Sequence, residues 1–84
     1  MSYTLVIGRD AQRALARIHD PDYGRILTAI QALVNDPRPR GCKKLRNRDA
    51  WRIRIGNYRV IYEINDRALV VTVVDVGNRR DVYR

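Results

Sequence analysis

The sequence predicts an α+β domain, with two N-terminal helices packed on one face of a small, mostly antiparallel sheet. Apolar residues recur at helical spacing between residues 11 and 34. Residues 51–76 show the alternation and the β-branched content of strands. No repeat or linker interrupts the 84 residues. The expected element order is therefore βααβββ within a single domain, residues 1–84.

A short strand over residues 3–7 leads into the two helices. Asp10 suits the capping position of the first helix, whose apolar positions continue to Ile18. Asp20-Pro21 separates the helices and places Pro21 at the first position of the second. The second helix has the clearer apolar stripe, and Pro37 follows its end. The stripe comprises Tyr23, Ile26, Leu27, Ile30, Leu33 and Val34.

The strand half begins after a polar, basic connection over residues 37–49, with room for a short strand near Leu45. Residues 51–55 and 58–64 are predicted to form a hairpin around the two-residue loop Gly56-Asn57. This loop places Ile55 opposite Tyr58, and Arg54 opposite Arg59. Residues 69–76 are nearly continuous β-branched sequence and are predicted to form a central, buried strand.

Arginines stand at alternate positions of this hairpin. Since side chains alternate between the two faces of a strand, the apolar partners take the core face, and Arg52, Arg54 and Arg59 take the opposite, open face. The core set is Trp51, Ile53, Ile55, Val60 and Tyr62. Like charges placed opposite each other cost about 0.2–1 kcal/mol per pair. A bound anion would offset this cost, and phosphate is the usual anion for arginine.

The net charge of +8 lies wholly in the second half of the chain. Residues 1–37 hold four arginines and four aspartates, whereas residues 38–84 hold thirteen basic and five acidic residues. This asymmetry favours a polyanionic partner over a generally solvated basic surface. The basic residues expected to contact the phosphates of RNA or the ribosome are Lys43, Lys44, Arg46, Arg48 and Arg80.

Several classes of protein are disfavoured by composition. Cys42 is the only cysteine, which excludes an internal disulfide and a cysteine metal cluster. We therefore expect no metal or other cofactor, and a reduced cytoplasmic location. The sequence shows neither a signal-peptide core nor a transmembrane span, so no membrane partner is expected.

The second half resembles the RelE/ParE toxin superfamily of bacterial and archaeal toxin–antitoxin systems. The resemblance rests on Lys44-Leu45, on WRIRIGNYRVIYEI at residues 51–64, and on VDVGNRRDVYR at residues 74–84. Its RelE branch implies cleavage of messenger RNA in the ribosomal A site, by attack of a 2′-hydroxyl on the adjacent phosphate. It also implies neutralisation by a cognate antitoxin, and binding to operator DNA only through the toxin–antitoxin complex.

The positions that the resemblance marks as catalytic are occupied by Arg52, Arg54, Arg59, Arg79 and Tyr83. The best-known members have lysines in place of Arg52 and Arg54. Arginine does not lose its proton in proteins, so we expect these two residues to orient the RNA and stabilise charge. Arg59 and Arg79 are expected to bind the phosphate, and Tyr83 to stack on a base or donate a proton. The group that takes the 2′-hydroxyl proton stays open.

Two alternatives to a metal-independent endoribonuclease stay open as well. One is a ParE-like inhibitor of DNA gyrase, a binding module on the same scaffold without nuclease chemistry. The other is a nucleic-acid-binding domain that is not a toxin. The five filled positions favour the ribonuclease, while the missing lysines leave room for the gyrase inhibitor.

Overall fold

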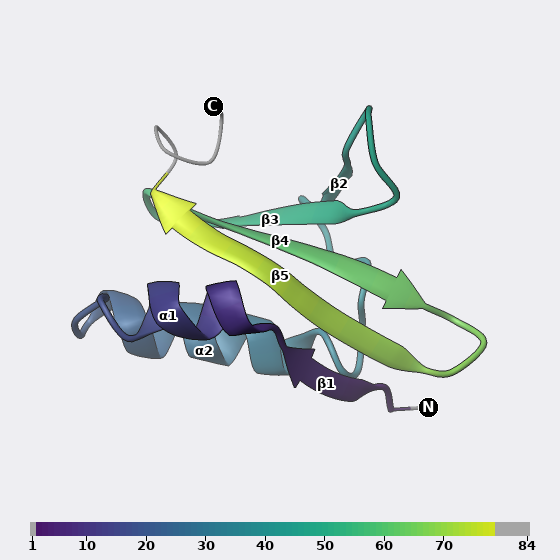
Figure 1. The fold of residues 1–84 in the computed structure, drawn as a ribbon, viewed down its shortest axis with the longest axis horizontal. Helices are drawn as coiled ribbons and strands as arrows, with labels where there is room; N and C mark the ends of the chain where they lie inside the picture. Colours follow the sequence, from purple (N-terminus) through teal and green to yellow (C-terminus); the bar gives the residue numbers. More distant parts are fainter. Residues whose placement is uncertain (1, 79–84) are drawn as a thin grey trace.

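Two helices cover one face of a five-stranded sheet in the computed structural model, which describes residues 2–78 (Figure 1). In chain order the elements are β1 (Thr4–Ile7), α1 (Arg9–Leu15), α2 (Asp22–Ala32), β2 (Lys43–Lys44), β3 (Trp51–Ile55), β4 (Tyr58–Asn65) and β5 (Val70–Asn78). The strand order is β1-β5-β4-β3-β2, with β1 parallel to β5 and the other pairs antiparallel. The predicted α+β class is confirmed, and β2, next to Leu45, is the short strand for which the basic connection had room.

The helix boundaries differ slightly from the predicted ones. α1 begins at Arg9, so Asp10 lies in its first turn instead of capping it, and the helix ends at Leu15 before reaching Ile18. The start is set by Gly8, whose amide donates to the Val73 carbonyl of β5 at 2.8 Å. A Cβ atom at Gly8 would lie 3.0 Å from that oxygen, so this close approach favours glycine.

At the start of α2, Pro21 occupies the N-cap position, one residue earlier than predicted. The Asp20 carboxylate accepts a hydrogen bond from the Gly24 amide at 3.0 Å, which satisfies one of the open donors of the first turn. Ile26, Ile30 and Leu33 are buried, as the apolar stripe predicted. Tyr23, at the N-terminal end of that stripe, is exposed instead.

The core lies between the helices and the inner face of β3, β4 and β5. It contains Ile53, Val60 and Tyr62 from the hairpin together with Val71 and Val73 from β5. The Tyr62 side chain is fully buried, and its hydroxyl donates to the Pro37 carbonyl at 2.7 Å. The helical layer therefore covers one side of the sheet only. Within residues 2–78, no helix is long and apolar enough to cross a membrane.

Candidate functional site

The predicted register of the β3–β4 hairpin is confirmed. Ile55 pairs with Tyr58 and Arg54 with Arg59, while Arg52 pairs with Ile61. The three arginines therefore share the face of the sheet that points away from the helices. A fourth cation joins them, because Lys43 of β2 pairs with Arg52 across the strand boundary. We call Lys43, Arg52, Arg54 and Arg59 the cationic face.

Two of these arginines are much less accessible than an open face implies. Arg52 is 8% exposed and Arg59 is 3% exposed, whereas Arg54 is exposed. Both lie on strands with a neighbour on each side, and their burial restricts the positions of their guanidinium groups. Burial also lowers the effective dielectric constant around the charges. The result is a set of permanently charged groups with restricted positions, a suitable arrangement for binding an anion.

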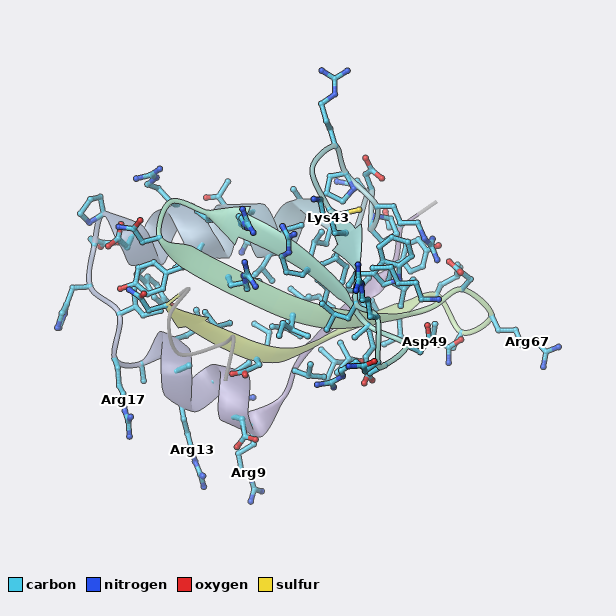
Figure 2. The ribbon with its side chains drawn as sticks, turned by 90° about the horizontal axis from the view of Figure 1, so that it is seen from above. Arg9, Arg13, Arg17, Lys43, Asp49 and Arg67 are labelled. Atoms are coloured by element: carbon cyan, nitrogen blue, oxygen red, sulfur yellow. The ribbon has the colours of Figure 1, made fainter. Side chains whose placement is uncertain are left out.

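A hollow of about 280 Å³ adjoins the cationic face on its β2 side. It is lined by Arg40, Gly41, Lys43, Arg52, Ile53 and Arg54. None of the described residues that line it is acidic. Figure 2 looks down on this side of the sheet and shows Lys43 beside the strands, whereas Arg9, Arg13 and Arg17 project away from it.

The other cations of the β2–β3 connection have different surroundings. Lys44 pairs with Trp51 in the register, so it points to the opposite face from Lys43, and its ammonium lies 3.3 Å from Asp49. Arg48 contacts Glu63 of β4 at 3.5 Å. Arg46 is exposed in the loop. The predicted RNA and ribosome contacts of these residues stay predictions.

A network around Arg38 was missed by the sequence interpretation. Arg38 contacts both carboxylate oxygens of Asp66, at 3.3 and 2.9 Å, and its guanidinium lies 5.0 Å from the centre of the Trp51 ring. The Tyr3 hydroxyl donates to the same carboxylate at 2.7 Å. Two hydrogen bonds lower the pKa of Asp66 below its ordinary value. The bond from Arg38 has the larger effect and the bond from Tyr3 the smaller. This network connects four segments of the chain and lies apart from the cationic face.

The remaining predicted site residues are Arg79, Arg80 and Tyr83, which lie outside the described residues. His19 lies exposed in the turn between α1 and α2. Residues 2–78 contain no group of three or more histidines, cysteines or acidic residues that could hold a metal ion. Arg40, which lines the hollow, was not among the predicted site residues, because no sequence pattern places it beside the hairpin.

Comparison with known proteins places this geometry in a family. The family model described as "ParE toxin of type II toxin-antitoxin system, parDE" matches residues 5–83. No curated protein matches the sequence. Solved structures do match, and they include RelE toxins in complex with RelB antitoxins.

The matching chain in the archaeal RelE–RelB complex of Pyrococcus horikoshii is 30% identical in sequence to this chain, with a TM-score of 0.83. The match covers 94% of this chain and 97% of that chain. The matching chain in the RelBE2 toxin–antitoxin complex of Mycobacterium tuberculosis is 27% identical, with a TM-score of 0.82. The match covers 94% of this chain and 100% of that chain. An arginine double mutant of Escherichia coli RelE in the free state is 25% identical, with a TM-score of 0.80 over 99% and 92%. The chain therefore belongs to the ParE toxin family within the RelE/ParE superfamily, and it is a toxin of a type II toxin–antitoxin system.

Proposed function

We propose that this toxin is a ribosome-dependent messenger RNA interferase that works without a metal cofactor and is neutralised by a cognate antitoxin. The observation that carries the proposal is the placement of Arg52, Arg54 and Arg59 on one face, with Arg54 and Arg59 at directly paired positions. Similarity to RelE toxins crystallised with RelB supports the antitoxin partner. Ribosomal RNA and operator DNA, the latter only through the antitoxin complex, stay predicted partners.

The proposed reaction cleaves the RNA backbone at one phosphate. The 2′-oxygen forms a bond to phosphorus, the bond from phosphorus to the 5′-oxygen breaks, and a 2′,3′-cyclic phosphate remains. Negative charge grows on the non-bridging oxygens as the phosphorane forms. Arg54 and Arg59 face this charge from adjacent strands, and one well-placed donor of this kind lowers a barrier by roughly 2.7–4 kcal/mol.

Proton transfer needs groups other than these arginines. The 2′-hydroxyl loses a proton and the leaving 5′-oxygen gains one, but a guanidinium group does not accept protons in proteins. We assign Arg52 to orienting the RNA backbone, while the acid or stacking role of Tyr83 and the phosphate contact of Arg79 stay predictions. The ribosome would hold the 2′-oxygen in line with the phosphate, which supplies the orientation part of catalysis.

A second candidate function is inhibition of DNA gyrase without nuclease chemistry. The specific observation in its favour is that the matching family model describes a ParE toxin. In this case the cationic face would contact gyrase or its DNA, and no RNA bond would be broken. The two functions therefore differ in whether a message is cut.

The decisive experiment uses translating ribosomes and maps the message by primer extension. We expect cuts in phase with the codons, and their loss in Arg59→Ala and Arg79→Ala. Arg67→Ala is the charge-matched control, because Arg67 lies in the distant β4–β5 turn, and it should cut normally (Figure 2). An intact message together with gyrase-dependent DNA damage would overturn the proposal in favour of the gyrase inhibitor.

A further inference from the structure

We infer that Lys43 and Arg40 form a subsite for a second RNA phosphate, the one next to the scissile phosphate. This inference rests on the proposed ribonuclease function. It also separates Lys43 from the other cations of its loop, which had been predicted together as general contacts to RNA or the ribosome.

The register of β2 directs Lys43 towards the cationic face. Lys44 is anchored on the other face, where it pairs with Trp51, lies 6.0 Å from the centre of its ring and contacts Asp49. Since consecutive side chains of a strand point to opposite faces, this anchor holds Lys43 on the open side, directly across from Arg52. A two-residue strand thus adds one cation to the hairpin.

A tight turn places Arg40 at the same hollow. The Cys42 amide donates to the Pro39 carbonyl at 3.1 Å, and Gly41 has a φ of +90°. This geometry is that of a type II turn, in which the third residue favours glycine. A Cβ atom at Gly41 would meet no other atom within 4 Å, so the conformation and not crowding favours glycine here. The turn brings Arg40 beside Lys43 without a helix or a long strand.

The charges around the hollow are unlike those elsewhere in the same loop. Lys44 and Arg48 each contact a carboxylate, from Asp49 and Glu63. Among the described residues, neither Arg40 nor Lys43 has an ion-pair partner. The hollow collects four cationic side chains and no described acidic one. A negatively charged ligand would offset the charges of Arg40 and Lys43.

The positions of the strands favour two phosphates over one. Lys43 lies on β2 and Arg59 on β4, with β3 between them. Adjacent strands are about 4.8 Å apart, so these backbones are separated by roughly 9–10 Å. Arg54 and Arg59 can share one phosphate, and the cations of the hollow then face the next phosphate along the strand.

The test uses two short, uncleavable RNA ligands and measures binding without the ribosome. One is a fully 2′-O-methylated trinucleotide with two internal phosphates, and the other has a neutral methylphosphonate at one linkage. The neutral linkage is placed at the first position in one ligand and at the second position in another. Binding of each ligand is followed by NMR titration at low salt. We expect the wild-type toxin to bind the doubly charged ligand more tightly.

The variants then locate the subsite. Lys43→Ala and Arg40→Ala should each weaken binding of the doubly charged ligand by about three- to tenfold. Each should also reduce the slope of log K against log salt by about 0.7. Neither should weaken the singly charged ligand by more than about twofold, because the first phosphate remains bound by the hairpin arginines. Lys43→Arg should restore binding, and the charge-matched control Arg67→Ala should bind as the wild type.

Two results would overturn the inference. One is an equal loss of both ligands in Lys43→Ala, since this residue would then serve the same phosphate as the hairpin. The other is an equal effect of Lys44→Ala, which would show a general charge effect and no face-specific subsite. Cleavage of message with either of these results would leave the ribonuclease proposal intact. Selective two-phosphate binding without message cleavage would instead contradict the ribonuclease proposal alone.

Discussion

The two faces around β3 hold similar cations in opposite electrostatic arrangements. On the open face, Lys43 lies across from Arg52, and Arg54 across from Arg59, so that positive charges are neighbours. On the side of Trp51, Arg38 and Lys44 approach the aromatic ring and each contacts an aspartate. Matched charges of the second kind stabilise the fold, whereas clustered charges of the first kind favour a bound anion. Strand register, rather than net charge, separates the two.

The largest expected effect is on catalysis when the cationic face loses one guanidinium. Under the proposed mechanism, Arg59→Ala should lower the rate of message cleavage by about 10²–10³-fold, because one donor to the phosphorane is removed. Arg38→Ala removes the same charge from the other side of β3. It should lower the melting temperature and leave the cleavage rate of the folded toxin within about twofold, since Arg38 lies outside the cationic face.

Single-turnover cleavage on programmed ribosomes measures the first effect, and thermal unfolding followed by circular dichroism measures the second. Arg59→Lys is the matched control, because it keeps the charge while losing the planar, two-pronged donor. It should fall between the wild type and Arg59→Ala. Equal losses of cleavage in Arg59→Ala and Arg38→Ala would remove the functional distinction between the two faces.

The dependence of the rate on pH would sharpen the role of the cationic face. If its arginines only stabilise charge, the 2′-hydroxyl proton leaves to hydroxide, and the single-turnover rate should rise about tenfold per pH unit between pH 6 and 8.5. Ribosome integrity at each pH is checked with a peptide-bond formation assay. A plateau within this range that is specific to the toxin would reveal a titrating base on the protein and contradict the purely electrostatic assignment.

The hairpin could be predicted from sequence because its information is local. A two-residue loop fixes the register of its strands, and the alternation of apolar and arginine residues then assigns the faces. β2 is too short to show any periodicity, so the position of Lys43 across from Arg52 left no recognisable signal. The contact of Arg38 with Asp66 joins residues 28 positions apart, in a loop and a turn, where sequence patterns do not specify pairing.

Burial was harder to predict than register. Alternation assigns Arg52 and Arg59 to the face without helices, but it does not report how closely neighbouring side chains pack around them. Both lie on strands that have a neighbour on each side, and both are buried. In the same way, the shift of register between Ile61 and Tyr62 depends on β5, which is remote in sequence from the hairpin loop.

A smaller effect, on stability, is expected from the core beneath the hairpin. Tyr62→Phe removes the buried hydrogen bond to the Pro37 carbonyl and should lower the free energy of unfolding by about 1 kcal/mol. This corresponds to a fall of about 4–8 °C in the melting temperature of a chain of this size. Cleavage by the folded variant should be unchanged, because the hydroxyl lies on the opposite side of the sheet from the cationic face.

Thermal unfolding of Tyr23→Phe provides the control, because Tyr23 is exposed and its hydroxyl is not part of the core. This variant should melt within about 1 °C of the wild type. A comparable loss of stability in both variants would contradict the assignment of the effect to the hydrogen bond between Tyr62 and Pro37.

The smallest expected effect is the contribution of Asp66 to stability in acid. Its pKa is lowered in the folded protein by the hydrogen bonds from Arg38 and Tyr3, so the unfolded chain binds this proton more readily. The stabilisation is therefore complete above the unfolded pKa of about 3.9 and is lost as the pH falls through the lower, folded value. Urea unfolding between pH 2 and 6 should show a shallower acid loss in Asp66→Asn and in Arg38→Gln. Arg38→Gln leaves the hydrogen bond from Tyr3 to Asp66, so it should remove less of the acid dependence than Asp66→Asn. The double variant should match Asp66→Asn, and additive losses would contradict a shared network on the paired side of β3.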